Sequence, residues 1–139
     1  MRLTVRASFV AYLLTIALFA SVDACLSAII ALAVHESSHL LVGRCLGERF
    51  DRIEIAPFGG LITSAQGNVP PKGWRGALIA AAGPIGNYFA IMVLTAPMLQ
   101  HALGEAFLKQ AVLANSVMML FNLLPVLPLD GGRIAFSLG

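Results

Sequence analysis

The chain has 139 residues, of which 58% are hydrophobic and only 12% are charged, and its mean hydropathy is +0.85. An average soluble domain carries about 25% charged residues, and one of this length could not bury so much apolar surface. The composition therefore indicates an integral membrane protein, with residues 1–139 as a single domain in contact with the lipid bilayer. A net charge of +2 is too small to favour a nucleic-acid partner. Cys25 and Cys45 are interpreted as small buried apolar residues.

Two apolar segments open the chain. The first, Ala7–Val22, has sixteen uncharged residues after two arginines, which fits either a signal peptide or a membrane helix. The residues around Asp23 make a poor cleavage site and a second apolar segment follows at once. We therefore predict an uncleaved membrane helix. The second segment, Ala24–Gly43, is long enough to span a bilayer.

The region Arg44–Arg75 is the only substantial polar part of the sequence. Polar and apolar residues alternate in Arg52–Ala56, which predicts a strand. Pro57–Gly60 interrupts the pattern, and Leu61–Ala65 fits a second short strand. The region therefore predicts a small β-hairpin or sheet at the membrane surface.

Two further apolar segments follow. Gly76–Leu99 carries no charge and predicts a third membrane span. After the short polar turn Gln100–Lys109, the apolar stretch Gln110–Leu129 contains Pro125 and Pro128 near its end. Two prolines three residues apart are incompatible with a regular helix, so an irregular backbone lining an internal cavity is expected there.

The distribution of basic residues predicts the orientation of these four spans. Positive charges favour the cytoplasmic side. They fall on one side of the membrane here, at Arg2, Arg6, the Arg44–Arg75 region and Arg133. The fold expected is an all-α, multi-pass protein of the cell membrane with about four helices, a small cytoplasmic sheet and both termini cytoplasmic.

The second span contains His35-Glu36-Ser37-Ser38-His39, the HExxH pattern of metalloproteases. Residues four apart share one helix face, so His35 and His39 can offer two nitrogens to one metal ion, with Glu36 within reach of a water molecule at that ion. Polar groups in an apolar helix are costly, which disfavours a chance match. Catalytic zinc usually takes a third protein ligand, and Asp130, predicted near the same membrane face, is the best candidate.

Asn122 precedes Asp130 by eight residues and has two interpretations. Its amide is expected either to cap the broken fourth segment or to hydrogen-bond the substrate backbone or the developing oxyanion.

Four segments carry a family resemblance: His35-Glu36-Ser37-Ser38-His39, Pro57-Phe58-Gly59-Gly60, Gly83-Pro84-Ile85-Gly86-Asn87 and Asn122–Arg133. In this order they resemble the site-2 proteases, which are intramembrane zinc metalloproteases. Among these, the branch of stage IV sporulation protein FB has the same short hairpin region and no inserted PDZ domain. Proteins of that branch commonly continue with further membrane helices after this last segment. The present sequence is therefore expected to be either a compact form or a fragment.

The resemblance implies a set of roles. His35, His39 and Asp130 would bind one zinc ion, Glu36 would be the general base, and Asn122 would assist at the active site. Substrates would be membrane-associated proteins, such as an inactive sigma factor precursor or an anti-sigma factor, and regulatory membrane proteins are potential partners.

The function predicted is therefore that of an intramembrane zinc endopeptidase. Two other classes stay open. One is a non-catalytic membrane protein that binds or scaffolds partners with the same fold. The other is a metal transporter that uses His35, His39 and Asp130 as a transport site.

Overall fold

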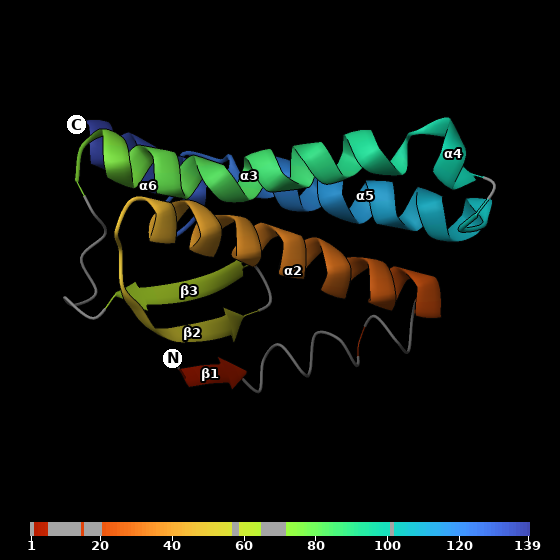
Figure 1. The fold of residues 1–139 in the computed structure, drawn as a ribbon, viewed down its shortest axis with the longest axis horizontal. Coiled ribbons are helices and arrows are strands. Elements are labelled where there is room, and N and C mark those ends of the chain that lie inside the picture. The colour runs from red at the N-terminus through yellow and green to blue at the C-terminus, as the bar shows by residue number, and fades with distance from the viewer. Residues whose placement is uncertain (1, 6–14, 16–20, 57–58, 65–71, 101) are drawn as a thin grey trace.

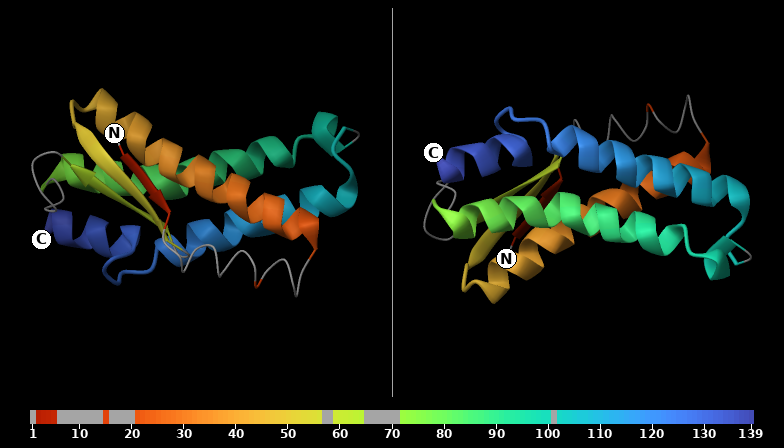
Figure 2. Two further views of the ribbon diagram at one scale, coloured as in Figure 1. Left: turned by 90° about the horizontal axis from the view of Figure 1, so that it is seen from below. Right: turned by 90° about the horizontal axis from the view of Figure 1, so that it is seen from above.

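The computed structural model describes residues 2–5, 15, 21–56, 59–64, 72–100 and 102–139. Its elements in chain order are β1 (Arg2–Val5), α2 (Val22–Cys45), β2 (Phe50–Ala56), β3 (Gly59–Ser64), α3 (Trp74–Leu94), α4 (Pro97–Gln100), α5 (Glu105–Asn122) and α6 (Asp130–Leu138). Helices α2, α3 and α5 pack against one another, and α6 packs against α3 (Figure 1). The sheet lies beside the C-terminal half of α2, at the end of the bundle that carries α6, and α4 lies at the opposite end (Figures 1 and 2).

Helix α2 is two residues longer at each end than the predicted second span. The hydroxyl of Ser21 accepts a hydrogen bond from the backbone N–H of Ala24 at 3.2 Å, which satisfies one of the free donors at the helix start. Asp23 in the first turn and Arg44 in the last turn both complement the helix dipole. Beyond the end of the helix, Gly47 adopts a φ of 86°, which turns the chain toward the sheet.

The outer faces of the helices are apolar and their inner faces are small or polar. On α3 the side chains of Tyr88, Phe89 and Val93 are 52%, 60% and 60% exposed. The buried positions of the same helix include Gly83 and Asn87. Small residues inside and large apolar residues outside are typical of helices packed within a bilayer. Among the described residues, α2 and α3 are the two helices long and apolar enough to cross a membrane.

The predicted break in the fourth apolar segment is confirmed. Helix α5 ends at Asn122, and residues 123–129 are not helical. Gly131 and Gly132 then pack directly on this loop. A Cβ at Gly131 would lie 2.6 Å from the carbonyl oxygen of Leu124, and a Cβ at Gly132 would lie 2.6 Å from the nitrogen of Leu127. Glycine thus lets the start of α6 lie against the loop, which sets the position of Asp130.

The small sheet has the order β1-β2-β3. Strands β2 and β3 are antiparallel, with Ile53 opposite Ile62, in the region where two short strands were predicted. Strand β1 pairs with β2 in parallel and was not predicted. The sheet joins the bundle where the Phe50 ring covers Gly43, so closely that a Cβ at Gly43 would lie 2.7 Å from Cε2 of the ring.

Two predictions on the N-terminal half have different outcomes. The membrane helix predicted for Ala7–Val22 falls mainly outside the described residues. The burial predicted for the cysteines is wrong for Cys45, which is exposed beside the turn after α2, whereas Cys25 is half-buried.

Candidate metal centre

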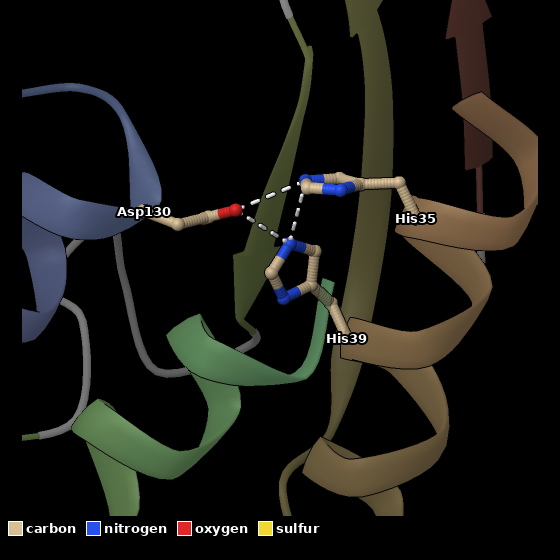
Figure 3. A group of neighbouring side chains, drawn as sticks. All are labelled: His35, His39 and Asp130. Carbon is tan, nitrogen blue, oxygen red and sulfur yellow. Dashed lines mark hydrogen bonds and ion pairs between the residues drawn. The ribbon is translucent and has the colours of Figure 1, made fainter. Parts of the chain in front are cut away.

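Three predicted site residues meet in the interior of the bundle. His35 and His39 project from α2, and Asp130, the first residue of α6, points toward them across the bundle (Figure 3). Oδ2 of Asp130 lies 2.9 Å from Nε2 of His35 and 3.1 Å from Nε2 of His39. The two Nε2 atoms are 3.2 Å apart. The three residues are at most 4% exposed, so the group forms a compact cluster shielded from solvent.

Helix α3 orients both imidazole rings from the other side. Nδ1 of His39 donates a hydrogen bond to the carbonyl oxygen of Ile79 at 2.7 Å. Nδ1 of His35 lies 2.6 Å from Oδ1 of Asn87. Ile79, Gly83 and Asn87 are four residues apart and therefore form one stripe along α3. This stripe holds the rings so that both Nε2 atoms face Asp130.

The donor atoms fit a divalent metal ion. Where Nδ1 carries the ring proton, Nε2 carries a lone pair. Two such lone pairs and a carboxylate oxygen within 3.2 Å repel one another unless a cation lies between them. Around a tetrahedral zinc ion with ligand bonds of about 2.0 Å, donor atoms would be about 3.3 Å apart. Two histidines and one carboxylate are also a frequent ligand set of catalytic zinc.

Glu36 and Asn122 are the other two predicted site residues. Glu36 directly follows His35 in α2 and is 7% exposed, so its carboxylate is held in the same buried region. Asn122 is 3% exposed at the end of α5, and its Nδ2 donates to the carbonyl oxygen of Met118 at 2.9 Å. This contact matches the helix-end interpretation of Asn122. Its role toward a substrate stays a prediction.

Sequence reasoning missed three residues that shape the centre, which are Gly83, Asn87 and Asn115. Gly83 and Asn87 lie in a segment that carried the family resemblance, but no role at the metal centre had been derived for either of them. Their four-residue spacing was the available signal, since it places both on one face of α3. Asn115 lies on α5, and no local pattern marks it.

We expect a methyl group at residue 83 to lower zinc affinity. A Cβ at Gly83 would lie 2.6 Å from Cε1 of His39 and 2.7 Å from Cε1 of His35, so α3 or the rings must move. The expected loss for Gly83→Ala is at least about tenfold, the scale on which contacts behind metal ligands act. Zinc affinity is measured by competition with a chelator of known strength.

Gly86→Ala is the matched control for this substitution. It adds the same methyl group to the same helix, but the new Cβ would meet the Ser38 side chain instead of the imidazoles. Equal losses in both variants would indicate a general effect on the packing of α2 against α3. Unchanged affinity in Gly83→Ala would contradict the close approach of α3 to the donor atoms.

Two histidines four residues apart on one helix with an adjacent glutamate are typical of metal-dependent peptidases, and Asp130 adds a carboxylate as the third donor. A family model described as Peptidase M50B-like matches residues 7–127, well over half of the chain. The chain therefore belongs to the M50B-like peptidases, and its resemblance to the site-2 proteases is confirmed.

Individual relatives support the same assignment. The chain is 33% identical over 112 residues to sll0528 of Synechocystis sp., which carries a provisional zinc metalloprotease name. It is 29% identical over 120 residues to stage IV sporulation protein FB of Bacillus subtilis. Its fold matches that of the site-2 protease from Methanocaldococcus jannaschii with a TM-score of 0.77 and 24% sequence identity.

These relatives are longer than the chain. The matches cover 78% and 83% of this chain but only 29% and 40% of the Synechocystis and Bacillus proteins. The structural match covers 96% of this chain and 64% of the archaeal protein chain. The chain thus corresponds to a part of each relative.

Proposed function

We propose that this chain forms the core of an intramembrane zinc endopeptidase that hydrolyses peptide bonds of membrane-associated proteins. The convergence of Nε2 of His35, Nε2 of His39 and Oδ2 of Asp130 carries the proposal. These atoms lie within helices whose outer faces are apolar. The zinc metalloprotease names of the relatives support the same function. No particular contact among the described residues favours the scaffold or the transporter.

The roles of the site residues follow from their chemistry. His35, His39 and Asp130 would hold one zinc ion, which when bound lowers the pKa of water and polarises the scissile carbonyl. Glu36 would take the proton from the attacking water and later deliver it to the leaving amine. The burial of Glu36, at 7% exposure, keeps this proton transfer away from bulk solvent.

Asn122 would assist from the end of α5. An asparagine amide nitrogen has two protons, and one of them is donated to the carbonyl oxygen of Met118. Nδ2 also lies 3.4 Å from Sδ of Met118, a weak acceptor, and its second proton would exchange this contact for the substrate backbone or the developing oxyanion. Asn122 thus combines both of its interpretations, since the bond at the helix end aims its amide.

The membrane arrangement is part of the proposal. Four spans would comprise the segment Ala7–Val22 followed by α2, α3 and α5, with the sheet at the cytoplasmic surface and both termini cytoplasmic. In support, the sheet and α6 lie at the same end of the bundle (Figure 1). Residues 1–139 would act as one catalytic domain in the cell membrane. The proposed substrates are of the sigma factor precursor or anti-sigma factor type. The proposed partners are regulatory membrane proteins.

Strand β3 (Gly59–Ser64) is the proposed contact for an unwound substrate. A helical substrate keeps its amides in internal hydrogen bonds, so it must unwind before hydrolysis, and an exposed strand edge can pair with the unwound segment. Strand β2 is paired on both sides, with β1 and with β3, so it has no free edge. Among the described strands, β3 provides an edge on the side away from β2.

Proline in β3 is expected to lower substrate cleavage severalfold. Successive strand residues direct their N–H groups to opposite sides, so one of Ile62→Pro and Thr63→Pro removes a donor from the outer edge. Cleavage is measured with zinc content as the check on folding, and Ile62→Ala and Thr63→Ala serve as controls. If both proline variants retain zinc and cleave at the normal rate, β3 does not hold the substrate.

The whole proposal is tested on the purified chain in lipid or detergent. We expect about one zinc ion per chain, cleavage of a co-expressed membrane protein, loss of cleavage on chelation and recovery with added zinc. Zinc without turnover on any membrane substrate would favour the scaffold. Metal flux into proteoliposomes without cleavage would favour the transporter.

A further inference from the structure

Two buried asparagines connect α5 to His35 through α3. Asn87 and Asn115 are 0% and 1% exposed. Nδ2 of Asn115 donates to the carbonyl oxygen of Ala111 at 2.8 Å, and Nδ2 of Asn87 donates to Oδ1 of Asn115 at 2.8 Å. Oδ1 of Asn87 lies 2.6 Å from Nδ1 of His35. Neither asparagine is itself one of the proposed metal ligands, which are His35, His39 and Asp130.

The hydrogen-bonding partners determine which way each amide points. The carbonyl oxygen of Ala111 can only accept, so Asn115 must turn its NH2 group toward it and its Oδ1 toward Asn87. Asn87 must then turn its own NH2 group toward Asn115, and a second bond at 3.0 Å to the carbonyl oxygen of Ala31 uses its other proton. This leaves Oδ1 of Asn87, which can only accept, facing His35.

The direction of the last bond determines the protonation of the imidazole. Because Oδ1 of Asn87 accepts, Nδ1 of His35 must carry a proton and donate it. In a neutral ring, Nε2 then has a lone pair, which faces Asp130. The opposite tautomer would place a proton on Nε2, at the position that a metal ion must occupy, and would leave Nδ1 of His35 facing Oδ1 of Asn87 with two lone pairs in contact.

We propose that Asn87, oriented by Asn115, is a positioning residue that holds His35 in the Nδ1–H tautomer and thereby prepares Nε2 for the metal. This rests on the proposed function, since the lone pair matters only where a metal binds. His39 provides an internal comparison. Its Nδ1 donates to the backbone carbonyl of Ile79, which no side-chain substitution removes. The chain of hydrogen bonds from Asn115 through Asn87, called the relay below, therefore acts on only one of the two imidazoles, that of His35.

The test substitutes Asn87 in two ways that keep four side-chain heavy atoms in the same branched shape. Asn87→Leu removes the acceptor, and we expect zinc affinity to fall about 10- to 100-fold. Asn87→Asp retains an acceptor for Nδ1–H, and affinity is expected to stay within severalfold of the unmodified chain although stability falls. Asn115→Leu removes one of the two bonds that orient the Asn87 amide and leaves the bond to the carbonyl oxygen of Ala31, so an intermediate loss is expected. Ser27→Ala is the control and should not alter affinity, since Ser27 is a polar residue of α2 that is likewise only 1% exposed.

The tautomer itself is read by ¹⁵N NMR of histidine-labelled, metal-free protein. The chain has only three histidines, and His101→Gln and His39→Gln assign their signals. We expect a protonated Nδ1 on His35 in the unmodified chain and in Asn87→Asp, and a redistribution toward Nε2–H in Asn87→Leu. The His39 signal should not change in these variants at position 87.

The outcomes separate this inference from the proposed function. Absence of zinc from the unmodified chain would contradict the proposed function. Normal zinc binding together with an unchanged tautomer and affinity in Asn87→Leu would overturn the inference alone. Equal affinity losses in Asn87→Leu and Asn87→Asp would also overturn it, because they would indicate a packing role. If Asn87→Leu does not fold, Asn115→Leu decides, and an unchanged tautomer and affinity there would overturn the relay.

Discussion

Glu36→Gln is expected to lower substrate cleavage by about 10²- to 10⁴-fold while zinc stays bound, because glutamine has nearly the shape of glutamate but cannot take a proton. Glu36 is 7% exposed and directly follows His35, so an isosteric change should leave the fold and the ligands in place. The measurement pairs cleavage of a co-expressed membrane substrate with the zinc content of the same preparation.

The matched control for this variant is Glu105→Gln. Glu105 is an exposed carboxylate at the start of α5 that forms an ion pair with Lys109 at 2.7 Å, away from the metal centre. The Glu105→Gln variant should cleave the substrate and bind zinc normally. Retained cleavage in Glu36→Gln would contradict the general-base mechanism, and loss of zinc in that variant would indicate that Glu36 supports the ligands instead.

Asp130→Asn is expected to weaken zinc binding by more than about a hundredfold, beyond the range for contacts that lie behind the ligands. The substitution keeps the size of the side chain but removes the negative charge that faces both Nε2 atoms at 2.9 and 3.1 Å. Two neutral imidazoles alone then face the ion. Cleavage should be lost together with zinc, and high concentrations of added zinc should restore part of both.

Asp23→Asn provides the control, since Asp23 lies in the first turn of α2 and contributes to the helix start. It should change stability slightly and zinc affinity not at all. Equal zinc affinity in Asp130→Asn and the unmodified chain would show that Asp130 is not the third ligand. The group of His35, His39 and Asp130 would then need another explanation for its close contacts.

Much of the framework of this molecule is predictable from local patterns. The apolar length of Ala24–Gly43 indicated a helix that the structure extends to Val22–Cys45, and two prolines indicated the break that the structure begins after Asn122. The HExxH spacing placed His35 and His39 on one face because helical geometry is periodic. Counting spans brought Asp130 to the same membrane face, and the structure places it beside both histidines.

Other features depended on contacts between distant segments. The parallel pairing of β1 with β2 could not be predicted, because four residues near the N-terminus carry too little pattern to indicate a strand partner. The burial of Cys45 was predicted wrongly, since its exposure depends on where the chain leaves α2 for the sheet.

The sequence by itself determined the apolar segments, the pair of histidines with its adjacent glutamate, and the break in the chain that two prolines impose before Asp130. These follow from composition and from spacings of a few residues. Only the tertiary structure decided that Ile79, Gly83 and Asn87 form the wall behind the imidazoles and that Asn115 orients Asn87. His35 and Asn87 are 52 residues apart in the chain, and their contact exists because α2 and α3 pack through small residues. The spacing of Gly83 and Asn87 places them on one face of α3, but a single sequence does not indicate which helix packs against that face.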